Sequence, residues 1–140
     1  MSDPFVDTDV IIRLLGKDDP RKQSEAAVLF EAVEAGKMQV AAPVTVIADA
    51  VYVLSSPRLY NISRADIREQ LSTLVRLPGF KVQSRRSVLS ALEIYANTKL
   101  DFGDAMIVAT MEENSSDILY SYDKHFDRIP NISRRVPNAV

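Results

Sequence analysis

The sequence predicts an α/β fold with a mainly parallel central sheet, and three observations support this prediction. Short runs rich in Val, Ile, Phe and Tyr alternate with longer segments whose apolar residues recur every three or four positions. Such alternation is typical of domains built on parallel strands. The chain has 140 residues, 46% of them hydrophobic, so we expect residues 1–140 to form one domain with a substantial core.

The elements follow from these patterns in chain order. Strands are expected at residues 5–6, 38–41, 80–83 and 118–121, with a last one near 135–136. An apolar run covers residues 10–15, and helices are expected at 21–35, 45–54, 63–75, 87–97 and 104–113. Thr45 and Ser63 are the predicted N-caps of two helices. The helix at 104–113 is apolar nearly all round, which favours a central position.

Composition excludes several classes of protein. The chain has no cysteine, so it forms neither disulfides nor thiolate metal sites. Charges interrupt every apolar run before it is long enough to cross a bilayer, and the first residues lack a signal-peptide pattern, so we expect a cytoplasmic protein without a membrane span. The net charge of −2 is a poor global footprint for nucleic-acid binding, although metal ions can neutralise the field locally.

Four aspartates lie at the edges of, or within, hydrophobic segments: Asp7, Asp49, Asp104 and Asp123. Aspartate is rarely buried unless it is paired or bound to a cation. Two carboxylates about 4 Å apart repel by about 4 kcal/mol at an effective dielectric near 20. If folding gathers these four, a divalent metal is therefore the natural partner, since hard cations prefer carboxylate oxygens.

Such a metal can activate a water molecule and stabilise the leaving oxygen of a phosphodiester, so that hydrolysis needs no protein nucleophile. This chemistry suits a chain with a single histidine and no cysteine. Each aspartate also has a structural interpretation. Asp7 could cap a helix, Asp101 or Asp104 could stabilise a helix start, and Asp123 could be a loop residue.

Other residues with side chains of catalytic or binding type have simpler interpretations. His125 is more typical of a surface or supporting residue than of a metal ligand. The tyrosines are more typical of core or boundary positions than of surfaces that stack on bases; they are Tyr52, Tyr95, Tyr120 and Tyr122. Nucleotide-binding glycine motifs, a serine-hydrolase motif and a zinc pattern are absent from the sequence.

Four segments of the chain resemble the PIN-domain ribonucleases, and most of all the VapC-type toxins of prokaryotic toxin–antitoxin pairs. They are residues 5–11 (FVDTDVI), 47–54 (IADAVYVL), 100–109 (LDFGDAMIVA) and 122–129 (YDKHFDRI). The resemblance spans nearly the whole chain. It implies a three-layer α/β/α domain around a parallel sheet.

The resemblance also implies an activity and a set of partners. The activity is that of a Mg²⁺- or Mn²⁺-dependent endoribonuclease, and the partners are a cognate antitoxin and a second copy in a homodimer. Asp7, Asp49, Asp104 and Asp123 match the acidic quartet of the family. Asp101 matches a frequent additional acid, and Ser121 falls near a position where a small hydroxyl residue supports the site.

Two positions depart from the family pattern. The family commonly has Asn at the position of Asp9 and Glu at the position of Asp49. The shorter side chain of Asp49 would reach a metal through water. The departures keep two alternatives open: a PIN-like module that binds RNA or protein without cutting, and a metal-dependent phosphatase or DNA nuclease. Basic residues expected to position RNA are Lys17, Arg21 or Lys124, and residues 52–74 are candidates for the dimer surface.

Overall fold

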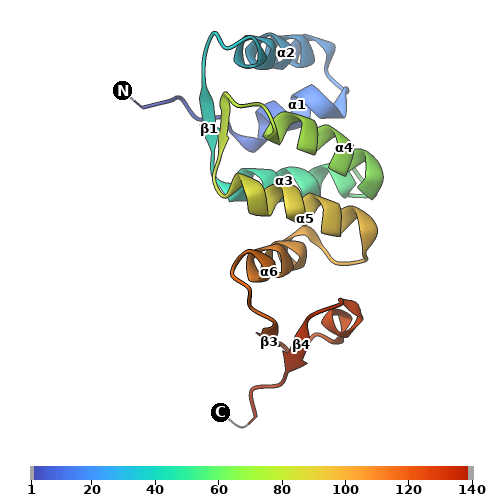
Figure 1. Ribbon diagram of the computed structural model, residues 1–140. Helices are drawn as coiled ribbons and strands as arrows, with labels where there is room; N and C mark the ends of the chain where they lie inside the picture. Colours follow the sequence, from blue (N-terminus) through green and yellow to red (C-terminus); the bar gives the residue numbers. More distant parts are fainter. Residues whose placement is uncertain (1, 139–140) are drawn as a thin grey trace.

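The computed structural model describes residues 2–138 and confirms an α/β fold with parallel strands (Figure 1). The helices are α1 (Thr8–Gly16), α2 (Pro20–Glu34), α3 (Val44–Ser55), α4 (Arg64–Val75), α5 (Arg85–Asn97) and α6 (Phe102–Glu113). The strands are β1 (Val40–Ala42), β2 (Phe80–Val82), β3 (Ile118–Tyr120) and β4 (Ser133–Arg135), and η1 (Lys124–Arg128) is a 3₁₀-helix. No helix within residues 2–138 is both long and apolar enough to span a membrane.

One of the two predicted N-caps is confirmed. The Ser63 hydroxyl accepts a hydrogen bond from the Asp66 backbone N–H at 3.2 Å and so begins α4. Thr45 was the wrong cap for α3, because that helix begins one residue earlier and directly after Pro43. Proline has a fixed φ and no N–H to satisfy, so the chain passes from extended backbone into helix at this point.

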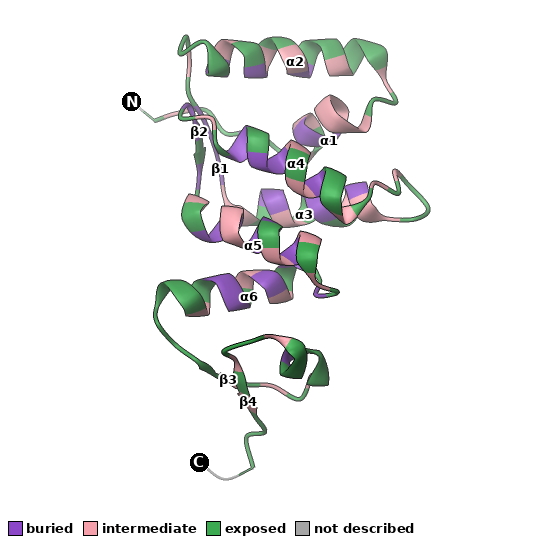
Figure 2. Cartoon of the chain, turned by 45° about the vertical axis from the view of Figure 1, so that its right-hand side comes forward, coloured by how far each residue is buried: buried purple, intermediate pink, exposed green. Residues whose placement is uncertain are grey.

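The strands form two separate parallel pairs where one central sheet was expected. β1 pairs with β2, with Val40 opposite Phe80, and Phe5 adds a single parallel bridge to Ala41. β3 pairs with β4, at a distance from the first pair in both views (Figures 1 and 2). For β3, pairing with β4, the next strand in the sequence, costs less loop-closure entropy than pairing with a strand near the start of the chain. This difference favours the β3–β4 pair.

The helices cover one face of the β1–β2 pair. In Figure 1 they lie to the right of β1, and the bridge register places Phe5, Ala41 and Lys81 together on the other face. Phe5 and Lys81 are exposed, and a groove of about 510 Å³ runs along this side. The second helical layer expected from the resemblance therefore does not cover this face within residues 2–138 of one chain.

Two apolar clusters hold the chain together. The larger surrounds the β1–β2 pair, where Phe30 and Phe80 pack edge to face with ring centroids 5.4 Å apart. The smaller consists of buried Leu100, Val108 and Phe126. It attaches residues 118–135, here called the C-terminal unit, to the helices α5 and α6.

Helix α6 is not central, contrary to the prediction. It buries Phe102, Ala105, Val108 and Ala109, but Ile107 is exposed and lines an apolar groove with Met106 and Met111. Figure 2 shows exposed residues along this helix and over most of the C-terminal unit. Helix α6 thus has apolar residues on both sides, of which one side faces the core and the other faces solvent.

Candidate functional site

The start of α6 places two acids one turn apart. Asp101 is the N-cap of α6, and its Oδ1 accepts a hydrogen bond from the Asp104 backbone N–H at 2.8 Å. Helix N-termini favour negative charge, because the first N–H groups lack intrahelical partners. The sequence allowed a capping role for either acid, and the structure gives that role to Asp101. The carboxylate of Asp104 does not act as the cap of α6.

The ionised form of Asp104 is disfavoured by its surroundings. Partial burial raises the pKa of its carboxyl, and the negative charges of Asp101 and Asp123 raise it further, against a small opposing effect of His125. The charge of Asp123, which precedes η1, therefore acts on the same carboxyl as that of Asp101, although Asp123 comes from a different part of the sequence than the two acids at the start of α6. Such crowding of carboxylates calls for a proton or a cation.

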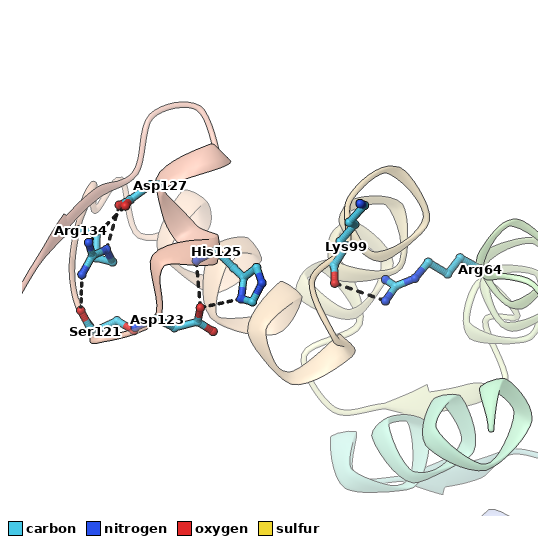
Figure 3. Close-up of polar contacts among 7 residues, drawn as sticks. All are labelled: Arg64, Lys99, Ser121, Asp123, His125, Asp127 and Arg134. Atoms are coloured by element: carbon cyan, nitrogen blue, oxygen red, sulfur yellow. Dashed lines mark hydrogen bonds and ion pairs between the residues drawn. The ribbon is translucent and has the colours of Figure 1, made fainter. Parts of the chain in front are cut away.

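Asp123 is fixed in place by its neighbours (Figure 3). Its Oδ1 accepts the His125 backbone N–H at 2.9 Å and lies 2.7 Å from His125 Nδ1. The backbone bond from His125 is the main reason why the pKa of Asp123 is lowered. The Ser121 hydroxyl accepts a hydrogen bond from the Asp123 backbone N–H at 3.0 Å. Ser121 therefore contacts the backbone of one of the predicted site residues, and its supporting role in the site stays a prediction.

Arg134 braces the C-terminal unit from β4. Its Nε and one terminal nitrogen bond both carboxylate oxygens of Asp127, at 2.8 and 3.1 Å, and the other terminal nitrogen donates to the Ser121 carbonyl at 3.0 Å. A forked ion pair of this kind fixes orientation as well as position. The sequence pattern gave Arg134 no such role, since its partners come from other elements.

Arg64 performs a similar task beside Asp101. Its guanidinium donates to the carbonyls of Tyr95, Thr98 and Leu100, at 2.9, 3.3 and 2.6 Å, and to that of Lys99 (Figure 3). It also lies over the Tyr95 ring, 4.2 Å from the centroid. These contacts hold the loop between α5 and α6, and therefore the residue before Asp101. No sequence pattern pointed to this role for Arg64, because its carbonyl partners lie far away in the sequence.

The other predicted site residues lie on or next to helices α1 and α3. Asp7 is the N-cap of α1 and accepts the Thr8 N–H at 2.6 Å, while Asp49 is exposed on α3. Asp9 lines a groove between α1 and α2. Within the described part of the chain, no three Asp, Glu or His side chains are close enough together to hold a metal ion. The donor types fit a hard divalent cation, but the number that one chain gathers does not.

Comparison with known proteins places the chain in a family. The family model described as PIN domain matches residues 5–132. The chain belongs to the PIN domain family. A solved structure described as a toxin–antitoxin complex from Klebsiella pneumoniae is similar at 19% identity, over 94% of this chain and 96% of that chain, with a TM-score of 0.34. No curated protein sequence matches the chain.

Three of the four tyrosines named above lie on the surface of this PIN domain, contrary to the prediction of core or boundary positions. Tyr95 is buried, whereas Tyr52, Tyr120 and Tyr122 are exposed. Tyr122 directly precedes Asp123. Because side chains alternate between the two faces of a strand, the sequence indicated that either Leu119 or Tyr120 faces outward. It did not indicate that β3 pairs with β4 alone, which leaves the other edge of β3 without a neighbouring strand in the described residues.

Proposed function

We propose that this PIN domain is a metal-dependent endoribonuclease whose acidic site includes Asp104 and Asp123. PIN domains are generally nucleases, which supports hydrolase activity for this chain. The observation that carries the proposal is the match to the PIN domain over residues 5–132, and the charges of Asp101 and Asp123, which help to raise the pKa of Asp104, are consistent with an acidic site at the start of α6. Uncompensated negative charge of this sort is typical of a position that receives a cation. When bound, the cation would supply charge neutralisation and an activated water.

A basic groove beside the acids supports a phosphodiester substrate. The groove has a volume of about 230 Å³ and is lined by Lys99, His125 and Arg128, among others. Lys99 lies two residues before Asp101, and His125 contacts Asp123. Cationic side chains next to an anionic metal site would position phosphates, which carry most of the affinity of nucleic-acid binding. Exposed Tyr122 could stack on a base of single-stranded RNA.

The finer assignments rest on the sequence resemblance. We propose Mg²⁺ or Mn²⁺ as the metal and Asp7, Asp49, Asp104 and Asp123 as its ligands, with Asp9, Asp101 and Ser121 in support. We propose further that the chain is the toxin of a VapBC-type pair in the cytoplasm, with an antitoxin as partner. A small open reading frame beside the gene is expected to encode that antitoxin.

The purified chain, freed of any partner, is expected to cut RNA with Mg²⁺ or Mn²⁺ and to stop when EDTA is added. The measurement compares labelled single-stranded RNA, DNA of the same sequence and a small phosphodiester. Glu69→Gln is a suitable control, because Glu69 is an exposed acid on α4 and outside the proposed site. Cutting of DNA or of the small ester in preference to RNA would replace the proposal by the DNA-nuclease or phosphatase alternative.

One observation favours a second candidate, a PIN-like module that binds RNA without cutting. The acids gathered within residues 2–138 do not by themselves suffice for a metal ion. RNA binding that persists in EDTA, with no cleavage products at any Mg²⁺ or Mn²⁺ concentration, would support this candidate over the nuclease.

A further inference from the structure

A groove of about 330 Å³ lies between α3 and the start of α6, and it is here called the α3–α6 groove. Pockets that bind small ligands begin at about 300 Å³, so the groove accepts one planar ring system of the size of a nucleobase. Its lining is aromatic and apolar with a few polar side chains, and it includes Val51, Tyr52, Ser55, Arg64, Tyr95 and Asp101.

Tyr52 supplies an aromatic ring that is open to solvent on this groove. Its side chain is 76% exposed, which is the highest exposure of any large hydrophobic residue in the described part of the chain. An aromatic ring in water gains free energy when an apolar surface covers it. A planar ligand that enters the groove can therefore stack on Tyr52, and nucleobases stack on aromatic side chains in this way.

Another part of the lining is already held in place. The Arg64 guanidinium lies 4.2 Å from the centroid of the Tyr95 ring and donates to the carbonyls of Tyr95 and Leu100, at 2.9 and 2.6 Å. Stacked and hydrogen-bonded side chains lose little freedom when a ligand arrives. The groove is therefore formed before any ligand binds.

The α3–α6 groove meets the basic groove at the loop before α6. Leu100 lines the basic groove and Asp101 lines the α3–α6 groove. Successive Cα atoms are about 3.8 Å apart, so the two grooves approach each other at this peptide. Figure 3 shows Arg64 in contact with Lys99 at the same loop. A nucleic-acid strand with its phosphates on Lys99 and Arg128 thus has a base within reach of the α3–α6 groove.

Asp101 gives the groove a hydrogen-bonding preference. Its Oδ1 accepts the Asp104 N–H at 2.8 Å, and an ionised carboxylate has further lone pairs but no donor. A base that bonds to Asp101 must therefore donate. Adenine, cytosine and guanine each carry an exocyclic amino group, whereas the ring N–H of uracil lies between two carbonyl oxygens that a carboxylate repels.

We propose that the α3–α6 groove holds one unpaired nucleobase of the RNA substrate, stacked on Tyr52, with preference for a base whose amino group faces Asp101. This inference rests on the endoribonuclease function proposed above and adds a specificity site to it. A base within a duplex is paired and stacked on its neighbours, so it must leave the helix before it can enter such a groove. The groove therefore restricts cutting to unpaired positions.

Fluorescence tests the groove without reference to cutting. The chain has no tryptophan, so Tyr52→Trp introduces a single reporter that keeps an aromatic ring at this position. Adenosine carries no charge, so it probes the groove without metal or phosphate contacts. In EDTA, adenosine is expected to quench the tryptophan at about tenfold lower concentration than uridine, because a hydrogen bond to a charged group is lost with uridine. Single-stranded RNA should also quench it, and duplex RNA of the same sequence should not.

Val28→Trp is the matched control, since Val28 is an exposed apolar residue on α2, and its emission should not respond to adenosine. Quenching of Tyr52→Trp by neither adenosine nor single-stranded RNA would overturn the proposal, whether or not the wild type cuts RNA. Emission of Tyr52→Trp that changes with protein concentration alone would assign the groove to a second copy of the chain, and this too would overturn it.

Cleavage kinetics test the contribution of the groove to substrate binding. Tyr52→Ala is expected to raise KM for single-stranded RNA by about 10- to 100-fold, the usual effect of losing one stacked base. Tyr52→Phe keeps the ring and should restore wild-type KM, and Val28→Ala should not change it. Normal KM for Tyr52→Ala would overturn the groove and leave the proposed function standing. A wild type that never cuts would defeat the proposed function, and the fluorescence would then decide the groove alone.

Discussion

Replacement of Asp104 by Asn is expected to reduce RNA cleavage by about 10³-fold while making the metal-free protein more stable at neutral pH. The loss follows because charge stabilisation by a metal is worth several kcal/mol, and each 1.36 kcal/mol is about tenfold in rate. The gain follows because burial and the charges of Asp101 and Asp123 disfavour the ionised carboxyl, which raises the pKa of Asp104. The amide has the same shape and no charge.

The pH dependence of stability tests whether the charge of Asp104 causes the expected gain in stability of Asp104→Asn. Since the pKa of Asp104 is raised in the folded state, that state binds the proton more tightly than the unfolded chain, and stability falls as pH rises through the folded-state pKa. The advantage of Asp104→Asn should therefore be full at neutral pH. It should disappear below the unfolded-state pKa, where both states of the wild type are protonated. Thermal unfolding in EDTA between pH 3 and pH 8, roughly the range that brackets an ordinary carboxyl, measures this.

Asp123→Asn is the matched control with the opposite sign. The hydrogen bond from the His125 N–H lowers the pKa of Asp123, so its charge stabilises the folded state above the unfolded-state pKa and this is lost as pH falls through the folded-state pKa. Both variants should lose cutting, but only Asp104→Asn should gain stability at neutral pH. RNA cleavage at the wild-type rate by Asp104→Asn would show that Asp104 is not part of the catalytic site.

Phe126→Ala is expected to release the C-terminal unit, at a cost of about 3–5 kcal/mol for a buried aromatic side chain. Phe126 is buried in the small cluster with Leu100 and Val108, and the unit has few other buried apolar contacts. Asp123 belongs to the unit and Asp104 to α6, so the loss of this contact should separate the two acids. We therefore expect cutting to fall together with the attachment of the unit.

Hydrogen exchange distinguishes release of the unit from general destabilisation. Amides of β3 and β4 should exchange faster in Phe126→Ala, while those of α3 and β1 should change much less. Phe126→Leu keeps most of the apolar volume and should lie between wild type and Phe126→Ala. Leu59→Ala, at an exposed residue, should change neither region. An equal increase throughout the chain would show that the unit is not a separate element of stability.

The helices were predictable because their signals are local. The spacing of apolar residues located α2, α4 and α5 to within a few residues, and Ser63 was a recognisable cap. The start of α3 was missed by one residue, since the fixed backbone of Pro43 outweighed the capping preference of Thr45. Strand positions were also predictable from composition. Their partners were not, because strands of three residues carry little information about register or neighbour.

The candidate site was predictable in its residues more than in its arrangement. Position at segment edges singled out Asp104 and Asp123, and the structure brings them into one field with Asp101. The contacts that hold them join residues far apart in sequence, such as Arg64 with Leu100, so no local pattern could reveal them. The grouping of Asp7 and Asp49 with the others stays a prediction. It depends on strand pairing, which is a property of the whole fold or of two copies.

Binding of Mn²⁺, followed by electron paramagnetic resonance, tests the central claim most directly: that the acids around Asp104 form a cation site for RNA hydrolysis. Mn²⁺ prefers oxygen ligands of the type found here and reports binding without any need for turnover. We predict that the wild type binds Mn²⁺, that Mg²⁺ displaces it, and that Asp104→Asn and Asp123→Asn each weaken binding strongly while Glu69→Gln does not. Equal binding by the wild type and both site variants would contradict the account.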